Sequence, residues 1–433
     1  MSIDNNRLNE KTAGAVRRTA DVYMDILEYL WAIFIVLNGN SVFHASAARD
    51  FKLLEISVAM TFLLLIFNFL FRRIRATRMN VVFMIVILLY STLYLSVMQM
   101  KINAGVFIKL FLLGGPAMFL LFVELHRQGR LVRLMGRFVN ILCVLAAVSL
   151  VFWYLGVIAK VIQPNMYIPI SWGNFQYAEG FYGVHYAFQL DTTFFPDAYI
   201  YRNSGIFAEA PMFNLWLNFA LAIELFLKDK PSKFKAVLLI VTILTTMSVT
   251  GILFVALCLG LFSVLHFKEM KKWSKGLLLI IAVVAVPAMA VLLVQTLMLK
   301  GDTQSFQMRL SDYSGGARMW IDYPLFGAGF GNLKALQPYV YSPDGAMGFS
   351  NSIMAVLSTG GAWMAVLYYV SHIAMLFPQV MGSKKYACFG WCMLFLFCTT
   401  IFFARLIGVM VIMLGYALMV GKPYVEKNRE NLP

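Results

Sequence analysis

The chain has 433 residues, of which 61% are hydrophobic and only 13% are charged. A soluble domain is close to half apolar and a quarter charged, so this composition excludes an ordinary soluble enzyme and predicts an integral membrane protein. The formal charge of +15 is gathered in short clusters between apolar runs, which argues against a nucleic-acid-binding protein.

The apolar runs have the length of membrane-spanning helices. A helix needs roughly 17–25 mostly apolar residues to cross about 30 Å of hydrocarbon and satisfy its own backbone. Two tight pairs of runs, the seventh with the eighth and the eleventh with the twelfth, could instead be re-entrant hairpins. The sequence predicts an all-α polytopic protein with about twelve transmembrane helices. The predicted spans are 24–43, 53–71, 80–99, 104–124, 138–161, 208–227, 235–249, 251–267, 276–298, 352–378, 386–403 and 406–421.

Lysine and arginine are concentrated in alternate connections between these spans. The positive-inside rule assigns the basic connections to the cytoplasm, so both termini are expected there. This divides the chain into a cytoplasmic segment (1–22), a transmembrane domain (23–421) and a cytoplasmic tail (422–433). The first segment has no apolar core of a cleavable signal peptide. The basic clusters lie within 7–18, 72–78, 127–137, 228–235, 268–275, 384–385 and 422–429.

Two connections on the opposite, periplasmic side are long, at 163–208 and 299–350. Both are rich in aromatic residues, glycine and proline, whereas disordered segments are poor in aromatics. Long ordered loops on a rigid scaffold often carry function. We therefore expect two large structured outer loops with the active site on the outer face.

The first loop ends with Arg202 and Glu209 and runs directly into a predicted helix. Glu209 and Pro211 both suit the first turn of a helix, where a carboxylate opposes the dipole and proline lacks only an unused donor. That purely structural role is one interpretation of Glu209. The other is a carboxylate at the membrane surface that acts as a base or orients a partner.

The second loop contains Arg309 and Arg318, followed by Asp322 and a glycine-rich turn with Gly327 and Gly329. The turn follows a proline and opens no βαβ unit, which excludes a dinucleotide-binding fingerprint. It predicts a backbone bend that lets a bulky ligand approach closely. The alternative for the arginines is contact with lipid headgroups or with nearby aspartates.

Three outer arginines, Arg202, Arg309 and Arg318, predict a site for a polyanion, because guanidinium forks match phosphate oxygens. Lys109 lies inside an apolar run and either extends outward to the surface or helps to hold a pyrophosphate. His44 and His185 lack ligand-like neighbours, and the five cysteines read as buried apolar side chains. No metal and no cofactor are expected.

These motifs resemble those of bacterial O-antigen and exopolysaccharide polymerases (Wzy type) and their relative, the O-antigen ligase. Residues 202–211 are similar to an R-x-x-G-x-F-x-E-x-P motif that leads into the helix after the first large outer loop. Residues 248–251 resemble a hydroxyl-rich turn, and 318–329 an arginine–tryptophan segment followed by P-L-x-G-x-G. Residues 349–361 resemble the segment that opens the next helix.

The resemblance implies a GT-C type fold in a bacterial plasma (inner) membrane, with an inverting, metal-independent glycosyl transfer on the periplasmic side. The donor would be a glycan on undecaprenyl pyrophosphate and the acceptor a sugar hydroxyl, with membrane lipids, a chain-length regulator and a flippase as further partners. Arg309 and Arg318 would bind the pyrophosphate, with Arg202 and Lys109 assisting. Glu209, then Asp322, would receive or orient the acceptor hydroxyl.

One residue departs from the ligase pattern. Ligase-like members of the family carry a histidine before the asparagine, whereas this chain has Ser350 before Asn351. A serine cannot take up a proton at neutral pH, so a polymerase is the better hypothesis. The alternatives are an O-antigen ligase-like transferase and a twelve-helix transporter or flippase for lipid-linked glycans, which would show two similar halves that this chain lacks.

Overall fold

The computed structural model describes residues 21–45, 52–71, 76–98, 102–169, 177–191, 194, 196–269, 304–340 and 349–421. The side chains at the start of α12, including that of Arg309, lie outside this description. So do the predicted span 276–298 and both predicted cytoplasmic tails.

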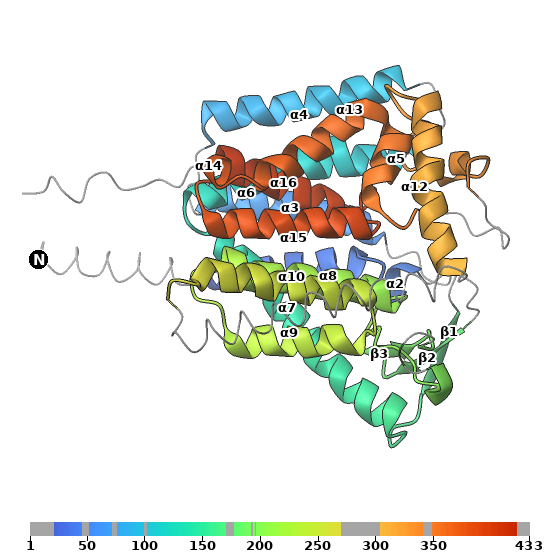
Figure 1. Ribbon diagram of the computed structural model, residues 1–433. Helices are drawn as coiled ribbons and strands as arrows, with labels where there is room; N and C mark the ends of the chain where they lie inside the picture. Colours follow the sequence, from blue (N-terminus) through green and yellow to red (C-terminus); the bar gives the residue numbers. More distant parts are fainter. Residues whose placement is uncertain are drawn as a thin grey trace, which may run out of the picture.

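The described chain is a bundle of helices with one small sheet (Figure 1). The sheet is an antiparallel meander of β1 (Met166–Pro169), β2 (Tyr177–Phe181) and β3 (His185–Ala187). The helices are a first helix over 21–38, then α2 (Val42–Ala45), α3 (Leu53–Phe71), α4 (Arg78–Val97), α5 (Ala104–Phe107), η1 (Ile108–Gly114), α6 (Gly115–Arg127), α7 (Leu131–Phe152), η2 (Trp153–Ile158), η3 (Pro196–Ala198), α8 (Ala210–Ala222), η4 (Ile223–Leu227), α9 (Lys233–Thr245), α10 (Val249–His266), α12 (Gln304–Asp322), η5 (Leu333–Leu336), α13 (Ser352–Met375), α14 (Pro378–Met381), α15 (Lys384–Thr399) and α16 (Leu406–Val420).

Within the described residues, seven helical stretches are long and apolar enough to cross a membrane. They are α3, α4, α5–α6, α7–η2, α8–η4, α10 and α13. α16 is also apolar but is shorter than these stretches. The mostly helical, polytopic membrane fold is therefore confirmed. The total of twelve spans and the GT-C assignment stay predictions, as does the choice between spanning and re-entrant for the two tight pairs.

Two helical stretches form the centre of the bundle. α8 with η4 is 94% buried and α5–α6 is 72% buried, whereas only 22% of α4 or α10 is buried. α6 packs against α3, α4 and α16, and α8 packs against α7, α9, α10 and α15. Since the outer helices expose apolar side chains on the side away from the core, their exposed faces suit contact with lipid.

A π-helical segment, η1, interrupts the α5–α6 stretch just before Pro116. Proline has no N–H and its ring clashes with the preceding turn, so a register shift of one residue relieves the helix at this point. Lys109 lies in this segment and forms an ion pair with Glu55 of α3. The intramembrane lysine thus has a carboxylate partner.

The two outer loops contain regular structure at one end of the bundle. β1–β3 and α12 lie at the right-hand end in Figure 1, opposite α14. The three strands lie within 163–208, and α12 lies within 299–350. The prediction of ordered loops is confirmed for the described parts, but the sequence interpretation did not include a 19-residue helix in the second loop.

The glycine-rich turn after α12 inserts into a kink of α13. Gly361 interrupts the helix with φ +64°, and Ala362 N and Trp363 N donate to the carbonyls of Pro324 and Leu325. A Cβ on Gly327 would lie 2.3 Å from the carbonyl carbon and oxygen of Thr359. The group that closely approaches Gly327 is thus the backbone of α13, whereas the sequence predicted a ligand there.

We expect Gly327→Ala to destabilise the protein by about 2–4 kcal/mol, because it combines positive φ with a backbone clash. Gly129→Ala is the matched control: Gly129 has a similar φ of +67° but no atom within 4 Å of the added Cβ. Thermal unfolding of both variants in the same detergent measures the difference. Equal shifts in Tm would show that the approach to α13 contributes nothing.

Candidate functional site

The segment before α8 is held in place by the small sheet and by Ser41, which follows the first helix. Ser204 Oγ donates to the carbonyl of Tyr186, and Phe207 forms a β-bridge with Ser41. Gly205 has φ +54°, and its bare Cα faces the ring of Phe213. These contacts hold the motif that begins at Arg202 in one conformation.

Arg202 is held by two acceptors from different parts of the chain. Its Nε donates to the carbonyl of Thr246 at 2.8 Å, and Nη1 donates to Gln189 Oε1 at 3.2 Å. Burial lowers the pKa of Arg202, whereas the charges of Asp191 and Glu209 act to raise it. Arginine remains protonated under such conditions, so this is a fixed, enclosed cation.

Glu209 occupies the N-cap position of α8 with extended backbone, and Pro211 lies in the first turn. The predicted helix start is therefore confirmed. The Glu209 side chain makes no capping hydrogen bond to the helix. Its charge instead acts on two guanidinium groups, those of Arg202 and Arg405. A carboxylate that does not cap the helix but acts electrostatically on two arginines fits a role beyond helix capping.

Arg405 precedes α16 and was not among the residues singled out from the sequence. Burial lowers its pKa, and the charge of Glu209 acts to raise it. Its Nη1 lies 3.6 Å from Met212 Sδ in the first turn of α8. Arg405 also lines a cavity of about 100 Å³ together with Gly331 of the glycine-rich turn. Arg405 therefore lies near both the start of α8, which follows the first loop, and the glycine-rich turn of the second loop.

A sequence signal for Arg405 did exist. It is the only charged residue between 386 and 421, across two predicted spans. An ionisable residue next to apolar spans is a candidate functional residue, and its partner must be sought in the fold. Arg405 lies in the short connection between α15 and α16, whereas the predicted site residues were sought mainly in the two long loops.

Arg318 and Asp322 form a separate pair on α12. Arg318 Nη2 donates to the carbonyl of Tyr339 at 2.8 Å, and the Tyr339 hydroxyl donates to Asp322 Oδ2 at 2.6 Å. That hydrogen bond raises the pKa of Tyr339 to about 12. Both α12 residues are exposed and hold the segment after the glycine-rich turn against the helix.

The structure thus brings some predicted site residues together and leaves others apart. Arg202 and Glu209 interact electrostatically, whereas the hydrogen bonds of Arg318 and Asp322 are to Tyr339. Lys109 is engaged with Glu55 on α3. The predicted turn glycines have positive φ, as the bend requires: Gly327 +71° and Gly329 +103°.

The start of α13 is organised by Asn351 and Asp312. Asn351 Oδ1 accepts from Met354 N at 2.9 Å and caps the helix, while Ser350 N donates to Asp312 Oδ2 at 2.9 Å. Ser350, at the position where ligase-like members have histidine, is partly exposed.

In the part of the chain that the structure describes, no three His, Cys, Asp or Glu side chains are placed to hold a metal ion. Cys392 lies 3.6 Å from Cys258 of α10, sulfur to sulfur. Burial of these thiols agrees with the prediction that they act as small apolar side chains.

Comparison with protein families gives one match. Residues 234–369 match the Wzy_C family model, described as O-antigen ligase. This segment, called the Wzy_C domain below, is similar to that family. The predicted resemblance to O-antigen ligase-related membrane proteins is confirmed over this segment. No curated protein matches the chain.

The Wzy_C segment runs from α9 into α13 and includes both Arg318 and the glycine-rich turn. Arg202 and Arg405 lie outside it in sequence but border it in space. Arg202 bonds to Thr246 within the domain, and Arg405 shares a cavity with Gly331 of the domain.

Proposed function

We propose that this protein is a membrane glycosyltransferase that polymerises lipid-linked oligosaccharide repeat units into a surface polysaccharide. The substrates would be glycans on undecaprenyl pyrophosphate, and the reaction would occur on the outer face of the plasma membrane. The main support is that the charge of Glu209 acts on the guanidinium groups of both Arg202 and Arg405, and that these two arginines border the Wzy_C domain through Thr246 and Gly331.

This arrangement suits transfer of a sugar from a diphosphate. In an inverting step, the acceptor oxygen forms a bond to the anomeric carbon as the bond from that carbon to the diphosphate oxygen breaks. The electron pair leaves with the diphosphate, so negative charge develops there, and enclosed arginines stabilise it. The proton of the acceptor hydroxyl would pass to Glu209.

The remaining predicted residues have supporting roles in this proposal. Arg318 has an exposed guanidinium with one Nη bonded to Tyr339, so it would meet the donor at the outer surface, with Arg309 earlier in the same helix. Asp322 supports the same segment through the Tyr339 hydroxyl. Lys109, paired with Glu55, would contribute to the field near the outer membrane surface.

A ligase-like transferase is the second candidate, and the description of the matched family favours it. Such an enzyme would transfer finished polymer to a different acceptor. Ser350 favours the polymerase, because a hydroxyl cannot serve as the proton acceptor that histidine would provide. Arg202 and Arg405 would bind the diphosphate in either case, so the acceptor decides between the two.

The length of the surface glycan in cells lacking this protein separates the candidates. Loss of a polymerase is expected to leave surface glycan limited to one repeat unit. Loss of a ligase or a flippase would remove the glycan altogether, and loss of an unrelated transporter would leave it unchanged. Gel analysis of extracted glycan measures this, and restoration by the intact gene is the control. Unchanged long polymer would contradict the proposal.

A further inference from the structure

A second site lies at the end of the bundle that carries the basic clusters, away from Glu209. A cavity of about 600 Å³ opens between the first helix, α7 and α9. Its walls carry Arg133 and Arg137 of α7, Lys235 of α9, and Lys228 of the connection before α9. Gly136 leaves part of the α7 wall without a side chain.

The acidic side chains at this cavity are already engaged. Asp25 lies 2.7 Å from Arg137, and the exposed Asp229 lies 4.0 Å from Lys385. Behind the wall, the buried Glu224 binds Lys228 at 2.6 Å and accepts from Ser232 N at 2.7 Å. These acids therefore balance Arg137 and Lys228 rather than the whole cavity.

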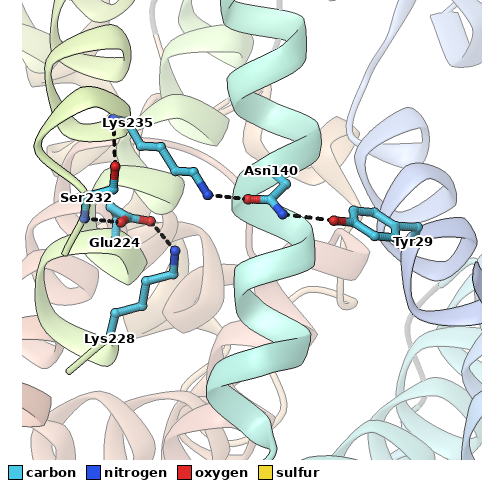
Figure 2. A network of polar contacts seen from close by, with 6 residues as sticks. All are labelled: Tyr29, Asn140, Glu224, Lys228, Ser232 and Lys235. Carbon is cyan, nitrogen blue, oxygen red and sulfur yellow. Dashed lines mark hydrogen bonds and ion pairs between the residues drawn. The ribbon is translucent and has the colours of Figure 1, made fainter. Parts of the chain in front are cut away.

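Two cations of the cavity remain without a carboxylate. Lys235 Nζ donates to the amide oxygen of Asn140 at 2.5 Å, and the same amide donates to the Tyr29 hydroxyl at 2.9 Å (Figure 2). Arg133 is exposed, and among the described residues it forms no ion pair. Two cations of the cavity, Lys235 and Arg133, thus stand in a preorganised polar frame without a carboxylate partner among the described residues, whereas Arg137 is paired with Asp25 and with the buried Glu28.

Apolar side chains beside the cavity indicate where the rest of a ligand would lie. Phe234 is 75% exposed and Val237 is 58% exposed, and the exposed stripe continues along α9 through Val241 and Leu244. Ile26, next to Asp25 on the first helix, is 51% exposed. A headgroup in the cavity could therefore extend its acyl chains along these apolar surfaces.

We propose that this cavity binds the phosphate headgroup of an anionic glycerophospholipid from the leaflet at the basic end of the protein. Lys235 and Arg133 would bind the phosphate oxygens, and Arg137 would contribute a donor at the edge. Basic pockets between membrane helices suit such headgroups, because the charge is satisfied while the chains stay in hydrocarbon. The proposal does not depend on the reaction at Glu209.

The test is lipid retention by the purified full-length protein in neutral detergent, counted by native mass spectrometry. Phosphatidylglycerol and phosphatidylcholine with identical chains are titrated separately. The intact protein should retain phosphatidylglycerol preferentially, and the double variant Arg133→Gln, Lys235→Gln should bind it about ten- to thirty-fold more weakly. Gly136→Leu, which fills the α7 wall without changing charge, should lower retention as well.

The matched control is Lys230→Gln with Lys233→Gln, which removes two exposed lysines of the same region that do not line the cavity. This control should retain phosphatidylglycerol like the intact protein. An equal loss in the control, or equal retention of phosphatidylcholine, would overturn the proposal. So would full displacement of the lipid by millimolar inorganic phosphate, since that result assigns the cavity to a soluble anion. Tm values close to that of the intact protein exclude misfolding.

Discussion

Replacing Arg405 by lysine is expected to lower the rate of polymer formation by about 100- to 1000-fold while the protein stays folded. Removal of one preorganised donor from developing negative charge has a cost of this size in other enzymes. Lysine keeps the charge that balances Glu209 but replaces the planar fork by a single ammonium. Arg405→Lys therefore tests the geometry of the donor group at constant charge, whereas Arg405→Ala would remove both the charge and the donors.

The measurement is the initial rate of chain growth on a synthetic lipid-linked repeat unit with purified protein. Lys334→Gln is the matched control, because Lys334 is an exposed cation in η5, next to the cavity residue Leu333. The control should retain at least half of the activity. Full activity in the Arg405→Lys variant would show that a fork is unnecessary there, and would remove Arg405 from the proposed reaction.

The helical framework was predictable from the sequence because its signal is local. A spanning helix must satisfy its own backbone, so length and apolar content alone define it. The predicted span 53–71 and α3 have identical ends, and the predicted start of a helix near Glu209 is the start of α8. The predicted basic connections 228–235 and 384–385 also lie close together in space, because Lys385 lies 4.0 Å from Asp229.

α12 was missed because it is a polar helix with an adjacent pair of glycines. Its buried positions are Asp312, Gly315, Gly316 and Met319, which recur with the spacing of one helical face. The glycines admit close neighbours: a Cβ on Gly315 would lie 2.7 Å from the carbonyl oxygen of Tyr339. A search for apolar runs cannot detect a face made of glycine and aspartate.

Which residues form the charged site depends on contacts between residues far apart in the chain, and the sequence alone does not specify these contacts. Arg202 and Glu209 are close in sequence and were predicted together. Arg405 meets them only because α16 packs in the bundle with its N-terminus at the start of α8. Arg318 was expected in the same group, but its hydrogen bond is to Tyr339, further along its own loop.

Glu209→Gln is expected to reduce the rate of chain growth by about 100- to 10,000-fold, the usual range for loss of a general base. The amide is nearly isosteric but cannot take the proton of the acceptor hydroxyl. The acid limb of the pH–rate profile should disappear with it. Glu179→Gln on β2 is the matched control, since it removes another carboxylate of the first outer loop.

Donor binding distinguishes a base from a residue that only positions the arginines. The charge of Glu209 acts on both Arg202 and Arg405, so removing it leaves the two cations more able to attract the diphosphate. If Glu209 is the base, kcat should fall while the KM for the lipid-linked donor stays the same or decreases. If Glu209 only orients the two guanidinium groups, its loss should misplace them and raise that KM, and Glu209→Asp should restore binding. A raised KM with an unchanged kcat would therefore assign the proton to another acceptor and leave Glu209 as support for the diphosphate site.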